Sequence, residues 1–381
     1  MIGNNNMTSR REFLKAGAAL AAVAAAVPHQ AFAQAAAPVA VFAPSPGKWR
    51  NFEVVTTLDV APVDGKAGPA QAWVPLPSYT AADWFKPGES TWKTNAATAK
   101  VEKDPHYGAE MLHLVWAEGE ASPTVEIVSK FSTRDRATDF SKPSTPAPLS
   151  AEERAAFLKA TDLIPVDGIV KATSDKITAG KTSDVEKTRA IYEWVVENTY
   201  RNAATRGCGT GDVASLLASG NLGGKCADLN ALFVGLVRAA GIPARDLYGI
   251  RVAPSAFGYK SLGANSPTIS KAQHCRAEVW LDGFGWVATD PADVRKVVLE
   301  EPPGKNPMDD AKVLAARKAL FGSWEGNWLA YNDGHDIALP GSNGPKLGFL
   351  MYPQAEVASL RHDCLDPDTF KYTIKASEIS A

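Results

Sequence analysis

The sequence predicts an α+β fold in which a helix that begins with a cysteine packs on an antiparallel sheet, preceded by a small β-sandwich domain. Three observations support this prediction. Residues 52–140 contain short runs of β-branched and aromatic residues without helical periodicity. A proline-rich stretch at 141–150 separates this part from the C-terminal remainder of the chain. Residues 226–240 then repeat apolar side chains at helical spacing, and the segments beyond residue 244 indicate strands.

The first 33 residues have the organisation of an export signal. Paired arginines in Ser9-Arg-Arg-Glu-Phe-Leu-Lys15 precede an apolar run at 16–27, and Ala31-Phe-Ala33 provides a cleavage site. The arginine pair followed by Phe-Leu-Lys resembles the bacterial twin-arginine signal. A membrane anchor is the alternative, but the run is short and rich in alanine for spanning a bilayer. We therefore expect a signal at 1–33 and a mature periplasmic protein that has no membrane contact.

The composition is that of an ordinary globular protein and argues against two classes of partner. The 381 residues include 40 basic and 42 acidic side chains, which give a net charge of −2, and 45% are hydrophobic. This balance gives no reason to expect binding to nucleic acid or to an anionic membrane. The length is sufficient for two domains.

The chain has four cysteines, Cys208, Cys226, Cys275 and Cys364. An oxidising compartment permits disulfides. If Cys226 stays free, at most one bridge can form among the other three, and the sequence does not choose it. Strand alternation points Cys275 away from the face that carries His274, so we expect it to pack or to bridge Cys208 without touching the cleft.

The predicted β-sandwich domain covers residues 34–147. Its strands are indicated by Phe52–Val60, Met111–Trp116 and Thr124–Phe131, which are rich in β-branched and aromatic residues. We expect Ala72–Pro77 to be an edge strand, because its prolines cannot donate to the hydrogen bonds of a sheet.

Residues 148–300 are predicted to form the core domain. A helix is expected after Ser150, whose hydroxyl can cap it, and a second helix over residues 184–198. Residues 301–381 are expected to form a C-terminal extension that packs on the core, with a charged helix at about 308–320.

The clearest helical period follows Cys226. Apolar residues occupy positions i, i+3, i+4, i+7, i+8 and i+11 over residues 229–240, and a Gly-Ile-Pro sequence ends the helix. A cysteine at this place has two interpretations. The commoner is a buried structural residue; the other is a nucleophile whose thiolate is stabilised by the positive end of the helix dipole. The Gly-Gly pair at 223–224 would let a substrate backbone approach closely, which favours the nucleophile.

A thiolate nucleophile needs a base and a group that orients the base. Residues 273–290 indicate a β-hairpin. Its cross-strand register places Asp290 opposite residues 275–277, within about three positions of His274. We therefore predict that Cys226 is the nucleophile, His274 its base, and Asp290 the acid that holds the imidazole.

Four motifs in this order resemble the core of the transglutaminase-like superfamily. They are Gly224-Lys-Cys-Ala-Asp-Leu229, Ala239-Ala-Gly-Ile-Pro-Ala-Arg245, His274-x-x-Ala-Glu-Val-Trp-Leu281 and Gly285-Trp-Val-x-x-Asp-Pro291. The resemblance covers about residues 183–298. It implies a papain-like core with the nucleophile, base and orienting acid of the family at Cys226, His274 and Asp290.

The resemblance implies acyl transfer from an amide through a Cys thioester. The acceptor is water in the protease-like and deamidating members of the family and an amine in its cross-linking members. We expect a peptide or protein substrate and a hydrolytic reaction. The alternatives are an amine-accepting cross-linking enzyme and a non-catalytic protein-binding module on the same fold, against which the intact Cys/His/Asp set argues. The sequence has no EF-hand-like loop, so we expect no calcium and no other cofactor.

Three further residues are assigned to oxyanion or substrate binding, namely Tyr200, Gly224 and Lys225. Tyr200 is either an oxyanion donor, by analogy with aromatic donors in the family, or a core aromatic that ends a helix. Backbone N–H groups at the start of the Cys226 helix are the other expected oxyanion donors. The glycine-rich segment 207–212 lacks the lysine and the spacing of a phosphate-binding loop. A metal site is not expected, because C-x-x-C and H-x-x-x-H pairs are absent.

Overall fold

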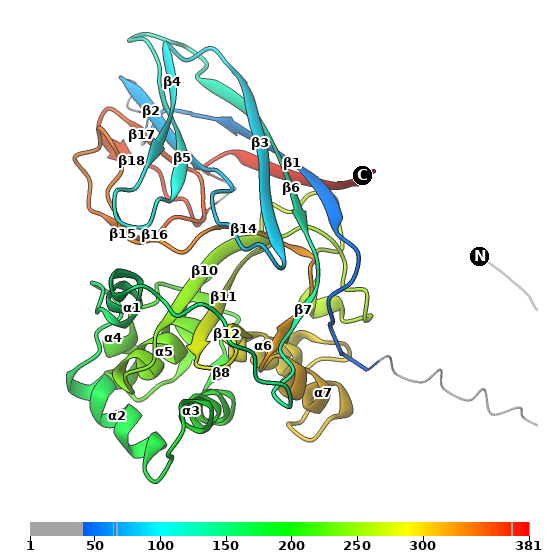
Figure 1. The fold of residues 1–381 in the computed structure, drawn as a ribbon. Coiled ribbons are helices and arrows are strands. Elements are labelled where there is room, and N and C mark those ends of the chain that lie inside the picture. The colour runs from blue at the N-terminus through cyan, green and yellow to red at the C-terminus, as the bar shows by residue number, and fades with distance from the viewer. Residues whose placement is uncertain (1–40, 64, 66–67, 367–368, 381) are drawn as a thin grey trace, which may run out of the picture. The chain divides into compact units, whose positions relative to one another are not determined.

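Three sheets of four or five strands organise the described part of the chain, and helices gather against one of them (Figure 1). The computed structural model describes residues 41–380, apart from 64, 66–67 and 367–368. The predicted export signal at 1–33 and its cleavage site lie outside the described residues. Within the described ranges, no helix combines the length and the apolar character needed to cross a membrane.

Two antiparallel sheets share an apolar core with the rest of the chain. Their strand orders are β19–β1–β6–β3 and β18–β17–β2–β5–β4. The strands are β1 (Arg50–Asp59), β2 (Ala70–Pro75), β3 (Phe85–Thr94), β4 (Thr98–Lys103), β5 (Glu110–Val115), β6 (Thr124–Thr133), β17 (Gln354–Val357), β18 (Leu360–Arg361) and β19 (Tyr372–Ile379). Every second residue of β1 is buried, as expected of a strand with one face on a core.

The predicted strands are confirmed as β1, β5 and β6, but the edge-strand prediction for Ala72–Pro77 is wrong. Strand β2 lies between β17 and β5. Strand β17 pairs only with residues 70–73, so Pro75 has no neighbouring strand on the β17 side. The missing N–H of the proline therefore costs no hydrogen bond with β17. The proline-containing edge strand is β3, where a bulge follows Pro87.

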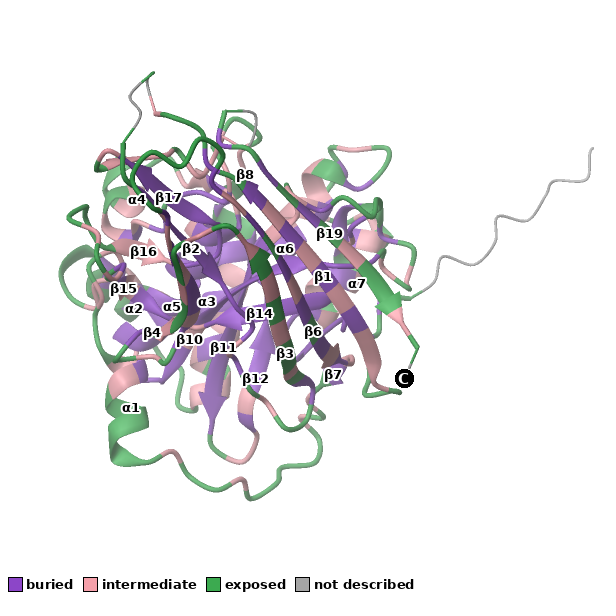
Figure 2. Cartoon of the chain, turned by 90° about the horizontal axis from the view of Figure 1, so that it is seen from above, coloured by how far each residue is buried: buried purple, intermediate pink, exposed green. Residues whose placement is uncertain are grey.

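The third sheet is antiparallel and has the order β12–β11–β10–β14. Its strands are β10 (Ala244–Arg251), β11 (Gln273–Leu281), β12 (Gly285–Thr289) and β14 (Trp328–Asn332). Strands β10 and β11 are buried almost throughout, whereas β3 exposes much of its length (Figure 2). The β11–β12 hairpin pairs Ala277 with Thr289 and Trp280 with Trp286, which confirms the predicted cross-strand register.

The helices gather around strands β10 to β12 (Figure 1), and α5 packs on β10 and β11. They are α1 (Ala151–Leu158), α2 (Gly168–Thr178), α3 (Asp184–Asn198), α4 (Val213–Ser219), α5 (Cys226–Ala239), α6 (Pro291–Glu300), α7 (Ala311–Ala319) and the short 3-10 helix η1 (Lys260–Leu262). The predicted helices after Ser150, over 184–198 and from Cys226 are confirmed. Helix α6 lies outside the helices predicted above.

The C-terminal residues supply strands to all three sheets. Strand β19 pairs along β1, and β17 pairs with β2, so the sheets expected from residues 34–147 also contain residues 354–379. Strand β14 pairs with β10 in the third sheet. Short pairs complete the topology: β7 (Arg136–Ala137) with β13 (Ser323–Trp324), β15 (His335–Ile337) with β16 (Leu347–Phe349), and the parallel pair β8 (Tyr200–Arg201) with β9 (Gly223–Gly224).

Candidate active site

Cys226, His274 and Asp290 come together from three neighbouring elements. Cys226 is the first residue of α5, His274 is the second residue of β11, and Asp290 directly follows β12. Helix α5 packs on β11, and β12 pairs with β11. Cys226 and His274 line one cavity of about 600 Å³. Their side chains are therefore at a cavity wall, although the two residues are only 4% and 3% exposed.

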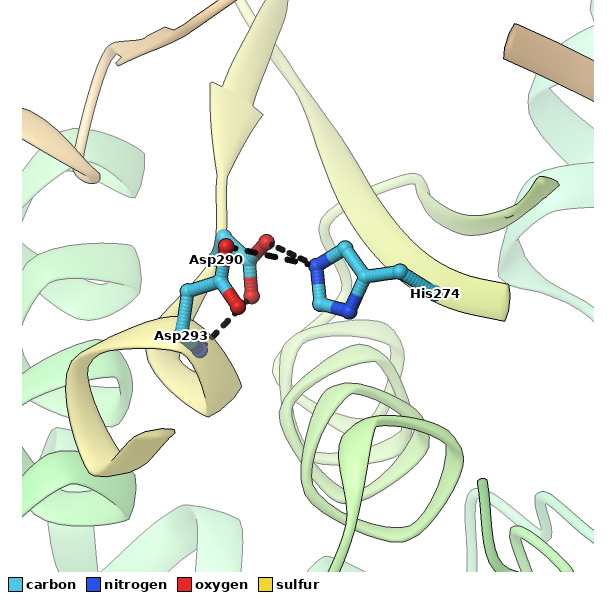
Figure 3. A group of neighbouring side chains, drawn as sticks. All are labelled: His274, Asp290 and Asp293. Carbon is cyan, nitrogen blue, oxygen red and sulfur yellow. Dashed lines mark hydrogen bonds and ion pairs between the residues drawn. The ribbon is translucent and has the colours of Figure 1, made fainter. Parts of the chain in front are cut away.

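The His274 imidazole is bound to the Asp290 carboxylate. The Nε2 atom of His274 lies 2.7 Å from Oδ2 of Asp290 (Figure 3). The second ring nitrogen, Nδ1, faces away from the carboxylates in this view, which leaves it for the thiol. Oδ1 of Asp290 accepts hydrogen bonds from the Asn230 amide at 3.2 Å and from the Asp293 N–H at 3.0 Å. The Asp290 carboxylate is thus fixed at both oxygens.

A second carboxylate, from Asp293, stands beside the same ring. Its Oδ2 lies 3.4 Å from His274 Nε2, and Figure 3 shows both aspartates on one side of the imidazole. The Arg251 guanidinium donates to both oxygens of Asp293 at 2.6 and 2.7 Å. Although burial would raise the pKa of Asp293, the Arg251 charge holds it well below its usual range. Sequence reasoning missed both residues of this buried ion pair.

The electrostatics of the site favour a thiolate and an imidazolium. Burial and the Arg251 charge lower the pKa of His274, but Asp293 and Asp290 outweigh them and raise it to about 9. Hydrogen bonds from Cys208 and Cys275, together with the contribution of His274, hold the pKa of the Cys226 thiol well below its usual range despite burial. Both shifts act in the same direction, toward a Cys226 thiolate beside a protonated His274.

Two other thiols surround the Cys226 sulfur. All four cysteines are free, so none of the pairings open to the sequence is formed. Interaction with Cys226 raises the pKa of Cys208, and burial raises that of Cys275, so both shifts favour the protonated thiol. The Cys208 thiol donates its hydrogen to the Gln273 carbonyl at 3.3 Å. Cys275 does not line the cavity, as expected, but its thiol does interact with Cys226, which the sequence did not predict.

The start of α5 is fixed by Asp228 and by the loop that carries Cys208. The Asp228 carboxylate accepts from the backbone N–H groups of Thr210, Gly211 and Lys225 at 2.9–3.0 Å. The Ala227 N–H donates to the Cys208 carbonyl at 2.9 Å, so it is not free to bind an oxyanion. Of the first two N–H groups of the helix, the Cys226 N–H is the one without a hydrogen-bond partner among the described residues.

The three residues assigned to oxyanion or substrate binding differ in their positions. Lys225 lines the cavity, whereas Tyr200 and Gly224 are not among its described lining residues. The Tyr200 hydroxyl donates to Asn221 Oδ1 at 2.6 Å. A Cβ at position 224 would lie 2.5 Å from the Asp228 Cβ, so this glycine is required by packing. An oxyanion role for Tyr200 stays a prediction.

Two buried side chains that the sequence did not single out support the site. Asn230, one turn after Cys226, donates to Asp290 and also to the Cys275 carbonyl at 2.9 Å. The Trp328 indole donates to the His274 carbonyl at 3.0 Å. Asn230 could have been found from the sequence, because it is a polar residue within an otherwise apolar helical stretch. Trp328 lies 54 residues from His274, and no local pattern connects them.

The carboxylates of this site are poorly suited to hold a metal ion. Among the described residues, the ligand atoms of His274, Asp290 and Asp293 lie within 4.8 Å of one another. However, Arg251 binds both oxygens of Asp293, and a cation placed beside this guanidinium would be repelled. The arrangement fits the positioning of His274 better than the binding of a metal.

Known proteins match both the core and the whole chain. Residues 171–291 match the family model of the transglutaminase-like superfamily. An uncharacterized protein from Haemophilus influenzae is 36% identical over 336 residues, which cover 84% of this chain and 89% of that protein. The structure of a proposed cysteine protease from Cytophaga hutchinsonii superposes with a TM-score of 0.53 at 13% identity, over 88% of this chain and 92% of that one. This likeness shows a shared fold.

Proposed function

The chain belongs to the transglutaminase-like superfamily, and on that premise we propose that it is a cysteine-dependent enzyme that hydrolyses a peptide or protein amide. The observation that carries this proposal is the buried His274–Asp290 pair at 2.7 Å, next to a helix-borne thiol on the same cavity. A purely structural cysteine needs no charged partner, whereas a nucleophile needs a base held in one orientation.

The proposed reaction begins with attack of the Cys226 thiolate on the carbonyl carbon of the amide. The Cys226 N–H stabilises the negative oxygen that forms. His274 gives its proton to the leaving amine as the C–N bond breaks, which leaves a thioester on Cys226. Water then attacks the thioester while His274 takes its proton, and the carboxylic acid and the free thiolate are released. Asp290 orients the ring throughout.

We also propose that this reaction takes place in the periplasm. The support is the twin-arginine-like sequence at residues 9–15, followed by an apolar run and a small-residue cleavage site. Expression of the full chain in a bacterium with an inactivated twin-arginine pathway should trap the protein in the cytoplasm with residues 1–33 attached. Unchanged export in that strain would contradict this part of the proposal.

Selective alkylation tests the nucleophile directly. We expect iodoacetamide to modify Cys226 near pH 6.5 at least ~10-fold faster than Cys364, because only Cys226 is held as a thiolate. Cys364 is a suitable control within the same chain, since it is partly exposed and burial raises its pKa. The rate at each site is measured by mass mapping. Equal rates at the two cysteines, or protection of Cys226 in a disulfide, would contradict the proposal.

The acceptor is tested with a glutamine-containing peptide library. Hydrolysis in H₂¹⁸O should place ¹⁸O in the new carboxylate, and a labelled primary amine should not be incorporated. The Cys226→Ala variant should lose the reaction entirely. Incorporation of the amine in preference to water would identify a cross-linking enzyme instead, and a reaction that persists without Cys226 would remove the thioester mechanism.

A further inference from the structure

The cavity beside Cys226 has a cationic wall. Among the described residues, its lining includes five basic side chains and one acidic side chain: Arg201, Lys225, Arg251, Lys271, Lys296 and Asp366. Arg251 is neutralised by Asp293, and Lys271 and Asp366 each have interactions of their own. Three basic side chains, Arg201, Lys225 and Lys296, are then left to account for the charge of the wall.

We propose that this wall binds a carboxylate of the substrate, so that the enzyme selects acidic peptide or protein amides. The inference rests on the proposed function, because it assigns the substrate class of the same cavity. Its support is the position and the incomplete pairing of Arg201, Lys225 and Lys296.

Lys296 is the most informative of the three. It lies on α6, its side chain is only 19% exposed, and its Nζ is 3.9 Å from the nearest acidic oxygen, on Glu300. Burial and the neighbouring Arg251 charge lower the pKa of Lys296 to about 8. A desolvated ammonium without a close counterion is costly in the unbound protein, and a substrate carboxylate would stabilise it.

Arg201 shares the same counterion. Its Nε donates to Glu300, which is also the neighbour of Lys296, so one carboxylate serves two cations. Glu300 is not among the described residues that line the cavity, whereas both cations are. The Nη groups of Arg201 have no partner among the described residues and are available to a ligand.

Lys225 brings positive charge next to the nucleophile. It directly precedes Cys226, lines the cavity, and takes part in none of the ion pairs among the described residues. A carboxylate bound between Lys225 and Lys296 would lie in a concave, partly desolvated site in which opposite charges attract strongly. This arrangement favours an amide that has an acidic group near the reacting carbonyl over a neutral amide of the same size.

Two alkylating reagents of similar size test the inference. Iodoacetate is an anion and iodoacetamide is neutral. The rate of Cys226 alkylation by iodoacetate is divided by its rate with iodoacetamide, and this value is divided by the same value for glutathione. The resulting normalised ratio measures how strongly the cavity attracts a carboxylate. This ratio does not depend on the thiolate fraction, which cancels. We expect a normalised ratio well above one in the wild-type protein. It should fall ~3- to 10-fold in Lys296→Gln and Lys225→Gln, and fall with added salt.

Matched variants separate charge from damage to the fold. Lys296→Arg keeps the charge and should keep the ratio. Lys187→Gln is the control for the substitution, because Lys187 is also half-buried and weakly paired, with Asp184 at 3.7 Å, but does not line the cavity. A urea unfolding transition like that of the wild type shows that each variant has folded, and any change in the thiolate fraction of Cys226 cancels in the ratio.

The outcomes distinguish this inference from the proposed function. Slow alkylation of Cys226 by both reagents, relative to Cys364, would contradict the proposed function. Fast alkylation by both, with a ratio that stays the same in Lys296→Gln and Lys225→Gln, would overturn the carboxylate site alone. An equal fall in Lys187→Gln would also overturn it, since the effect would then reflect the net charge of the protein.

Discussion

At the scale of single residues, two buried carboxylates and one buried guanidinium surround one imidazole. Asp290 and Asp293 face His274, and Arg251 closes the group by pairing with Asp293. Burial alone would expel the proton from His274, because a desolvated imidazolium is unfavourable. The nearby carboxylates reverse this effect. The chain thus keeps a charged histidine in its interior by surrounding it with fixed opposite charge.

The Asp293→Asn substitution should lower the pKa of His274. In the wild type this pKa is raised to about 9, so the imidazolium persists through neutral pH and is lost as the pH rises through that value. Removal of one carboxylate also frees the Arg251 charge, and both changes disfavour the imidazolium. We expect a decrease of about one to two units. NMR titration of the ring protons measures it, and the alkaline limb of the activity profile should move in the same direction.

The spectrum contains its own control. Burial lowers the pKa of His335 well below the usual histidine value, so its ring should stay neutral through the titration in both proteins. A His274 signal that titrates at the same pH with and without Asp293 would show that Asp290 alone determines its pKa.

At the scale of elements, the first turn of α5 depends on a loop that precedes it by about fifteen residues. The Asp228 carboxylate accepts hydrogen bonds from two backbone N–H groups of that loop. The Cys208 carbonyl, in the same loop, accepts a hydrogen bond from the Ala227 N–H of the helix. These contacts hold the Cys208 thiol beside the Cys226 sulfur. The pKa of the Cys226 thiol is therefore coupled to the order of the loop.

The Asp228→Ala substitution should both destabilise the protein and slow the alkylation of Cys226. It removes three hydrogen bonds to a partly buried carboxylate, which we expect to lower the free energy of unfolding by about 2–4 kcal/mol. The thiol pKa should rise as Cys208 moves away. Urea unfolding and the pH dependence of iodoacetamide labelling measure the two effects. Asp212→Ala is the control: it removes the cap of α4 from the same loop, should cost about 1 kcal/mol, and should leave the labelling unchanged.

Local patterns predicted the elements and part of the site. The period after Cys226 predicted α5, and the turn within 273–290 predicted the register that brings Asp290 near His274. Helix α6 also has a local signal, because Asp290 is its N-cap and proline occupies its first position, but the hairpin pattern over 273–290 indicates only strands. Asp293 was missed with that helix.

At the scale of the whole molecule, the sequence was far less informative. Strand β19 pairs with β1 across more than 300 residues, and β17 pairs with β2 across a similar separation. Strands β1 and β19 alternate buried with more exposed residues, and β2 and β17 are buried almost throughout, but neither pattern identifies the partner strand. The same holds for Arg251, which reaches Asp293 from another element. Long-range pairings are decided by the complete packing arrangement.

An ionic cluster around Glu278 joins the third sheet to the N-terminal part of the chain. Glu278 is fully buried on β11. Its carboxylate accepts from Arg136 of β7, from Arg245 of β10 at 2.8 Å, and from the Tyr79 hydroxyl at 2.9 Å. Arg136 and Tyr79 come from the N-terminal 140 residues. The motif that contains His274 thus also contains the residue that binds these two parts together.

The Glu278→Gln substitution should lower the free energy of unfolding by about 3–5 kcal/mol at pH 7, because it leaves two buried guanidinium groups without their shared anion. Burial opposes ionisation of Glu278, but Arg245 and Arg136 lower its pKa below the ordinary value. Its stabilising contribution is therefore complete above about pH 4.3, the usual value for glutamate, and is lost as the pH falls through the lowered pKa. The difference between variant and wild type in the free energy of unfolding, measured with urea, should shrink accordingly in acid.

Glu378→Gln is the matched control, because its ion pair with Arg50 is largely exposed and should contribute no more than about 1 kcal/mol. Equal losses in the two variants would show that the Glu278 cluster does not stabilise the joined parts.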